Sequence, residues 1–262
     1  MPDVLYEKRE KEHIAVFTLN RPERLNAISK KVTGELKKIT ADFVQDENLW
    51  VAIVTGAGDK AFSAGGDLIE MAEQAKAGKL DLKPETFDSV FPFHRAETCP
   101  KPVIAAVNGL AVGGGCELAL SADIRIASDN AYFGLFEIKR GIMAGFSICN
   151  LMRLMPFGEA MYYMLTADRM TVEEAHKYGL VQKVVPKEKL MSVAEGIARA
   201  ICENAPLSVR NTKATALYYR NLLLDEHNDY MGPLYQMVTE SEDAKEGTRA
   251  FVEKRQPIWK GR

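Results

Sequence analysis

Residues 101–120 read KPVIAAVNGLAVGGGCELAL, an apolar run followed by a glycine-rich turn and a second apolar run. Proline and Asn-Gly bound the apolar residues 102–107, a pattern typical of a short buried strand. The three glycines at 113–115 permit positive φ angles and a close approach of a ligand to the backbone. A strand, a tight turn and a helix in this order predict an α/β fold.

Similar patterns recur along the first part of the chain. Two strands are predicted at 4–10 and 14–19, and helical spacing of apolar residues begins after Ser29. Compact apolar strands are predicted at 50–54 and 124–127. The alternation of strands and helices favours an α/β body built from stacked strand-strand-helix repeats.

The strand signals stop at about residue 190. Residues 191–220 and 228–255 have a helical pattern with few turn residues. We therefore expect a core at 1–190 and a helical C-terminal region at 191–262. Amphipathic helices that project from an α/β body often bury one face against another subunit, so the second region predicts an oligomer.

The composition is that of an ordinary globular protein. The 262 residues are 47% hydrophobic and 27% charged with a net charge of −2, which favours neither nucleic acid nor an anionic membrane as a partner. No apolar run approaches the roughly 18 residues that span a bilayer, and no leader pattern precedes the first strand, so we expect a cytoplasmic protein. The four cysteines and four histidines are scattered, which predicts no metal site and a reducing compartment.

Two glycine turns carry the chemical interest. Backbone N–H groups at the start of the helix after Gly113 point outward, where the helix dipole favours an anion or a developing oxyanion. Residues 63–67, Ser-Ala-Gly-Gly-Asp, form a second turn of small residues. Taken alone, each turn is equally consistent with close packing, and neither fits the glycine patterns of dinucleotide or triphosphate sites.

Two glutamates stand in apolar surroundings. Glu117 lies within an apolar helical turn, where a carboxyl group must be paired, hydrogen-bonded or protonated. An elevated pKa would suit Glu117 to acid–base catalysis, and a buried ion pair with Arg125 or another basic residue is the alternative. Glu137 follows an apolar approach and precedes Lys139 and Arg140, so on its own it favours a surface salt bridge.

The chain resembles the crotonase superfamily, the enoyl-CoA hydratases and isomerases, in motif order and spacing over almost its whole length. The motifs are LNRP at 19–22, LNA at 25–27, FSAGGDL at 62–68, KPVIAAVNG at 101–109, GGGCELA at 113–119 and FVEKR at 251–255. Residues 51–58 and 242–262 are similar to members related to carnitinyl-CoA dehydratase.

The resemblance implies a spiral of ββα units with a helical C-terminal trimerisation region, assembled as a homotrimer or homohexamer. It implies an acyl-CoA thioester as the substrate, with coenzyme A as part of that substrate and no separate cofactor. It places the oxyanion hole on the backbone N–H groups of Gly66 and Gly114. The catalytic carboxyl groups then fall on Glu117 and Glu137, and Asp67 is most simply a helix N-cap.

The coenzyme A and substrate contacts follow from the same resemblance. They fall on Arg24, Ala27, Ala64, Asp67, Leu68, Gly145, Phe251 and Lys254, the last two reaching a neighbouring subunit. The stretch at 141–150 departs from the usual Gly-x-x-Pro-Gly-x-Gly-Gly. Ala144 replaces the proline and Ser147-Ile148 replaces the final glycine pair, while Phe146 and Ile148 add bulk beside the acyl group.

Retention of both glutamates favours water addition or removal by an enoyl-CoA hydratase or 3-hydroxyacyl-CoA dehydratase. A Δ3,Δ2-enoyl-CoA isomerase is the alternative, because it needs one carboxyl group. A hydratase of a carnitinyl, alicyclic or aromatic acyl-CoA is another. A non-catalytic scaffold or RNA-binding protein has little support in the negative net charge and the short lysine pairs.

Overall fold

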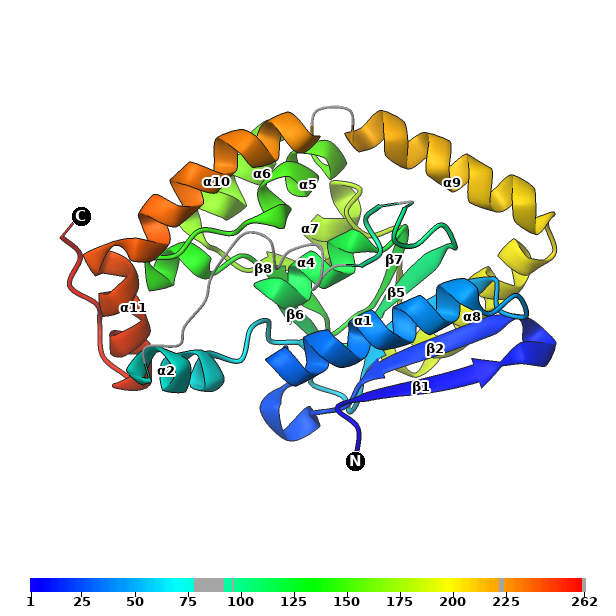
Figure 1. The fold of residues 1–262 in the computed structure, drawn as a ribbon, viewed down its shortest axis with the longest axis horizontal. Helices are drawn as coiled ribbons and strands as arrows, with labels where there is room; N and C mark the ends of the chain where they lie inside the picture. The colour runs from blue at the N-terminus through cyan, green and yellow to red at the C-terminus, as the bar shows by residue number, and fades with distance from the viewer. Residues whose placement is uncertain (78–91, 96, 222–223, 261–262) are drawn as a thin grey trace.

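A six-stranded sheet runs through the centre of the molecule. The structure is a computed structural model that describes residues 1–77, 92–95, 97–221 and 224–260 (Figure 1). The strands lie in the order β1 (Val4–Arg9), β2 (Ile14–Leu19), β3 (Val51–Gly56), β5 (Val103–Val107), β7 (Ile124–Ser128) and β10 (Lys183–Val185). The pair β1 and β2 is antiparallel, and the other neighbours are parallel.

A second sheet contains much shorter strands. Its order is β4 (Ala61–Ser63), β6 (Leu110–Val112), β8 (Tyr132–Gly134) and β9 (Met170–Thr171). The strands β4, β6 and β8 are parallel, and each follows a strand of the first sheet along the chain. A helix follows in turn, so the predicted strand-strand-helix repeat is confirmed.

Helices surround the two sheets. Those of the first part are α1 (Lys30–Gln45), α2 (Leu68–Lys76), α4 (Gly114–Ser121), α5 (Phe146–Leu154), α6 (Phe157–Thr166) and α7 (Val172–Lys177). Those that follow are α8 (Leu190–Cys202), α9 (Pro206–Asn221), α10 (Leu224–Glu240) and α11 (Glu242–Val252). Short 3₁₀ helices are η1 (Glu10–Glu12), η2 (Pro22–Arg24), η4 (Glu137–Arg140) and η5 (Lys187–Lys189). Among the described residues, none of the helices combines the length and apolarity that a bilayer span requires.

The two faces of the six-stranded sheet are covered differently. Alternate side chains such as Phe17 and Val54 face the core that contains α1 and α4. The opposite face, with Val16 and Ile53, packs against α8. The helices α9 and α10 continue beyond the sheet, and α11 lies beside α2 (Figure 1). The predicted boundary between a core at 1–190 and a C-terminal region at 191–262 stays a prediction. The helix α8, which follows residue 189, packs on the six-stranded sheet.

The start of α4 is pressed against β4. A Cβ atom on Gly115 would lie 2.3 Å from the carbonyl oxygen of Ser63, a separation that side chains do not adopt. Only glycine allows this approach of backbone to backbone. The absence of a side chain at Gly115 therefore sets the depth at which α4 sits in the spiral.

Gly115→Ala should lower the free energy of unfolding by about 3 kcal/mol, because backbone of β4 or α4 must move to accept the methyl group. Gly196→Ala is the matched control, since Gly196 lies in α8 with no atom within 4 Å of its added methyl group. We expect the control to be neutral or stabilising by up to about 1 kcal/mol. Urea denaturation measures both, and equal stability of the two variants would contradict this account of the α4 contact.

Candidate active site

The two predicted glycine turns lie against each other. Gly65 has a φ of 82°, and a Cβ atom there would lie 2.9 Å from the backbone nitrogen of Gly114. Gly113 precedes α4 with a φ of 53°. Both positions need glycine for their conformation, and Gly65 needs it for space as well. A methyl group on Gly114 would lie 3.6 Å from the amide nitrogen of Gly66, so the two predicted oxyanion donors are neighbours.

These two amides are available to a ligand. Gly66 is exposed and Gly114, the first residue of α4, is half-buried. In the part of the chain that the structure describes, no hydrogen bond uses the N–H group of either residue as its donor. The dipole of α4 adds positive potential at Gly114. The arrangement suits an oxygen atom that gains negative charge.

Glu117 is held from the neighbouring helix. Its side chain lies in the first turn of α4 and is 5% exposed. One carboxyl oxygen, Oε1, accepts hydrogen bonds from the backbone N–H group of Ser147 at 3.0 Å and from the Ser147 hydroxyl at 2.8 Å. Hydrogen bonds to the charged form favour the carboxylate.

The alternative ion pair between Glu117 and Arg125 is wrong. Arg125 donates instead to the carbonyl oxygens of Leu180 at 2.8 Å and Ala122 at 2.6 Å. The guanidinium group therefore ties β7 to the segments around it. The negative charge of Glu117 is met by Ser147 on α5.

The carboxyl group of Glu137, unlike that of Glu117, is buried with an oxygen atom that accepts no hydrogen bond from the described residues. A Cβ atom on Gly113 would lie 3.3 Å from Glu137 Oε1, which places this carboxyl group at the start of α4. Its Oε2 atom is buried without a hydrogen-bond partner among the described residues. Burial first, and the negative charge of Glu117 second, raise the pKa of Glu137 to about 8.

The surface salt bridge considered for Glu137 is not formed in the described structure. The Lys139 ammonium group donates to the carbonyl oxygen of Ala167, and Arg140 donates to that of Phe136. Both cations are thus occupied by carbonyl groups. The raised pKa of Glu137 therefore favours its protonated form, whereas Glu117 accepts two hydrogen bonds from Ser147.

Two further groups share the electrostatic environment of this acid pair. Tyr235 on α10 is buried, and burial with the charges of Glu117 and Glu137 raises its pKa to about 12. Cys116 is buried as well, and burial with the same two charges raises its pKa, which fits the predicted packing role. Sequence reasoning missed Tyr235, because α10 lies far from both glutamates along the chain and no motif marks this position.

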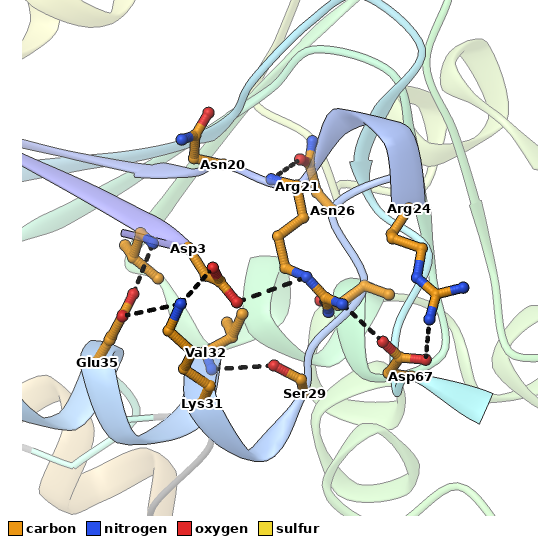
Figure 2. A network of polar contacts seen from close by, with 12 residues as sticks. Asp3, Asn20, Arg21, Arg24, Asn26, Ser29, Lys31, Val32, Glu35 and Asp67 are labelled. Carbon is orange, nitrogen blue, oxygen red and sulfur yellow. Dashed lines mark hydrogen bonds and ion pairs between the residues drawn. The ribbon is translucent and has the colours of Figure 1, made fainter. Parts of the chain in front are cut away.

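Asp67 organises the first part of the predicted coenzyme A contacts. Its Oδ1 accepts from the Glu70 N–H group at 3.3 Å, so the predicted N-cap is confirmed. Arg21 lies 2.9 Å and Arg24 lies 3.9 Å from its carboxyl oxygens, as Figure 2 shows. Burial alone would raise the pKa of Asp67, but the Glu70 and Arg21 hydrogen bonds outweigh burial and lower it.

The neighbouring predicted contacts line the same turn. The carbonyl oxygen of Ala27 accepts from Arg21 at 2.9 Å, and the Ala64 N–H group donates to the carbonyl oxygen of Leu25 at 2.9 Å. Leu68 begins α2 directly after Asp67. The structure therefore brings these residues and Arg24 to the turn that carries Gly66.

The remaining predicted contacts lie elsewhere on the chain. Gly145 is the N-cap of α5, two residues before Ser147, and so lies near Glu117. Phe251, near the end of α11, is 45% exposed, and the Arg140 guanidinium group lies 4.8 Å from its ring centre. Both line a cavity of about 210 Å³ beside η4. Lys254 is exposed in a left-handed conformation with a φ of 52°.

Metal ligands do not gather in the described residues, where no group of three or more His, Cys, Asp or Glu side chains could hold an ion.

Ser147 stands out in the sequence only as a departure from the glycine pattern. Its contact with Glu117 depends on how α5 packs on α4, which the sequence does not show.

Comparisons with known proteins give consistent results. The profile of the family described as Enoyl-CoA hydratase/isomerase matches residues 9–262. An (E)-benzylidenesuccinyl-CoA hydratase from Thauera aromatica is 38% identical over 250 residues, which are 95% of this chain and 96% of that protein. A short-chain-enoyl-CoA hydratase from Clostridium acetobutylicum is 39% identical over 259 residues, 97% of this chain and 95% of that protein.

Solved structures agree with the sequence comparisons. A carnitinyl-CoA hydratase from Mycobacterium avium superposes with a TM-score of 0.88 at 35% identity, over 100% of both chains. Likeness at this level extends through the helical C-terminal region. The predicted spiral of ββα units is confirmed.

The unusual state of Glu137 predicts a pH-dependent stability. The pKa of Glu137 in the folded protein, about 8, lies above the ordinary value of 4.5. The contribution of Glu137 to the free energy of unfolding is therefore fully present below pH 4.5 and is lost as the pH rises through 8. Glu137→Gln cannot ionise. The free energy of unfolding of the variant relative to the parent should therefore rise between these two pH values by on the order of 5 kcal/mol.

Urea denaturation of both proteins at a series of pH values measures this difference. The relative gain of the variant over the parent should be largest on the alkaline side of neutrality. A stability difference that stays constant across the series would show that Glu137 does not hold a proton in the folded state.

Proposed function

Because the chain belongs to the enoyl-CoA hydratase/isomerase family, we propose that it adds water to, or removes water from, the Cα–Cβ bond of an acyl-CoA thioester. The observation that carries the proposal is the meeting of two available amides with two carboxyl groups in unlike environments. Such pairs of carboxyl groups divide acid and base roles between them.

The thioester oxygen accepts hydrogen bonds from the Gly66 and Gly114 N–H groups in this mechanism. Charge moves onto that oxygen as enolate character develops, and the two fixed amides stabilise it without reorganising. One such donor typically lowers the barrier by roughly 3 kcal/mol. The closeness of the two turns supports this assignment, since one oxygen atom must reach both donors.

The carboxyl groups handle the water and its proton. Ionised Glu117 takes a proton from water while the water oxygen bonds to Cβ. Protonated Glu137 supplies a proton to Cα, and the electron pair of the double bond forms the new C–H bond. Dehydration follows the same path in reverse. The pKa of about 8 for Glu137 supports its role as the acid.

Coenzyme A enters as part of the substrate, and the proposed reaction needs no separate cofactor. Arg24 is suited to the phosphate groups, because its guanidinium side chain is 39% exposed beside the Gly66 turn. Ala27, Ala64 and Leu68 then flank the pantetheine and adenine. Phe251 and Lys254 complete the nucleotide site of a neighbouring subunit.

We further propose a homotrimer or homohexamer in the cytoplasm. Large apolar side chains remain exposed on the C-terminal helices, as expected for faces that another subunit covers. Among them are Leu207 at 71%, Tyr218 at 72% and Tyr219 at 78% exposure on α9. Sedimentation equilibrium distinguishes the two assemblies from a monomer.

An isomerase remains the second candidate, because it moves a proton between carbons with one carboxyl group. The presence of both Glu117 and Glu137 at the start of α4 favours the hydratase. Water labelled with oxygen-18 separates the two reactions. A hydratase places the label at Cβ, and an isomerase does not.

The identity of the acyl group can be tested with a panel of acyl-CoA thioesters. The relatives described above are named for a short-chain enoyl-CoA, benzylidenesuccinyl-CoA and carnitinyl-CoA. Ile148 near Gly145 is half-buried and adds bulk where the usual pattern has glycine, whereas the side chain of Phe146 lies outside the described part of the structure. A hydratase of a carnitinyl, alicyclic or aromatic acyl-CoA is therefore tested beside crotonyl-CoA.

Glu117→Gln and Glu137→Gln should each lower kcat for the best substrate by roughly 10²–10⁴-fold, because each removes one proton-transfer group. Affinity for a saturated acyl-CoA, which cannot react, should change by less than about tenfold, because the side-chain shape is kept. Steady-state kinetics and calorimetric titration measure the two effects. Unchanged kcat in both variants would remove the acid and base assignments.

A further inference from the structure

Ser147 combines complete burial with a direct contact to a proposed catalytic group. It is the second residue of α5 and is 0% exposed. Its hydroxyl and its backbone N–H group both donate to Glu117 Oε1, at 2.8 Å and 3.0 Å. In the glycine pattern from which residues 141–150 depart, this position is glycine, which has no hydroxyl group.

We propose that Ser147 is a positioning residue, which orients the Glu117 carboxyl group through its hydroxyl and keeps that group ionised before water is added. The inference rests on the proposed hydratase function for the role of Glu117. The contact itself is independent of that function.

The hydroxyl contributes what the backbone cannot. A glycine or alanine at 147 would still offer its N–H group to Glu117 Oε1, but this carboxyl group, which is 5% exposed, would lose its hydroxyl donor. The Ser147 hydroxyl adds a second donor at the same oxygen. Two donors from one rigid helix end fix the orientation of the carboxyl group as well as its charge.

Other charges around Glu117 make the hydroxyl more important. Glu137 from η4 and Tyr235 from α10 are near enough to couple with it electrostatically. Cys116 lies beside it on α4, with Arg125 of β7 beyond, and Arg140 acts on Glu137. Glu137 is thus a second carboxyl group close to Glu117, and a negative charge on either one opposes ionisation of the other.

The Ser147 hydroxyl thus helps decide which of the two glutamates holds the proton. With it, the negative charge stays on Glu117 and the proton stays on Glu137. Without it, protonation of Glu117 becomes easier. Glu137 titrates at higher pH, where Glu117 is ionised with or without the hydroxyl, so the loss of the hydroxyl acts on Glu117 first.

Direct titration tests the contact without any turnover. Infrared difference spectra of the ligand-free protein, labelled with carbon-13 at glutamate side chains, follow carboxyl protonation with pH. The Glu117 signal is the one that Glu117→Gln removes. In Ser147→Ala we expect its midpoint to move upward by about one pH unit.

Ser121→Ala is the matched control for losing a buried hydroxyl. Ser121 lies on the same helix as Glu117, is 1% exposed and donates to the carbonyl oxygen of Leu118 at 2.7 Å. This variant should leave the Glu117 midpoint unchanged. If Ser147→Ala, folded by circular dichroism, also leaves it unchanged, the proposal is overturned.

The pH profile of kcat/KM gives the second readout, with the best enoyl-CoA from the panel. Ser147→Ala and Ser147→Gly should move the acid limb upward by about one pH unit and leave the alkaline limb in place, so that the profile narrows from its acid side. On the steep part of the acid limb, a shift of one pH unit lowers kcat/KM about tenfold at a given pH. Ser147→Thr, which keeps the hydroxyl, should restore the width.

Two failures can be told apart. A uniform loss of kcat with both limbs in place would show a purely structural role for Ser147 and overturn the proposal. If the parent protein hydrates none of the thioesters, the proposed function fails, and the infrared titration still decides whether Ser147 controls the charge of Glu117.

Discussion

The contact between the turn at residues 63–67 and the start of α4 is the constraint on which the site depends. Gly65 and Gly113 both adopt positive φ angles, and a side chain on Gly65 would collide with the backbone of the other turn. The short strands β4 and β6 deliver these turns to the same place. Two amides that secondary structure leaves unused are thereby fixed side by side, and the repeated ββα unit is the means of positioning them.

The two glutamates at the start of α4 also differ in their hydrogen bonding. Glu117 is met by donors from α5, whereas Glu137 is buried with an unpaired oxygen among the described residues. Both carboxyl groups lie where the positive end of α4 favours negative charge, yet mutual repulsion lets only one ionise readily. Hydrogen bonding selects Glu117 as the charged member. The two carboxyl groups thus differ in their surroundings and not in residue type, as the proposed base and acid roles require.

Much of this was predictable from the sequence, for identifiable reasons. The strands β1, β2, β3, β5 and β7 are apolar runs bounded by turn residues, and α1 has clear helical spacing. The strands of the second sheet were missed because two or three residues are too few to show a period. The glycines and glutamates were found as motifs. The contacts of Glu117 with Ser147 arise only when α5 packs on α4, and Tyr235 comes near the two glutamates from α10, far along the chain. The predicted ion pair of Arg125 is not formed, because its guanidinium group donates to nearby carbonyl groups.

The central claim is that the Gly66 and Gly114 amides polarise one thioester oxygen, and vibrational spectroscopy measures this directly. The carbonyl stretch of a bound enoyl-CoA, labelled with carbon-13 at the thioester carbon, should move to lower frequency than in water. The shift should shrink in Gly66→Pro, which lacks the N–H group, and persist in Gly66→Ala, where the nearest atom to the added methyl group is Met71 Sδ at 3.4 Å. A bound carbonyl that vibrates as it does in water, in the parent protein, would contradict the account.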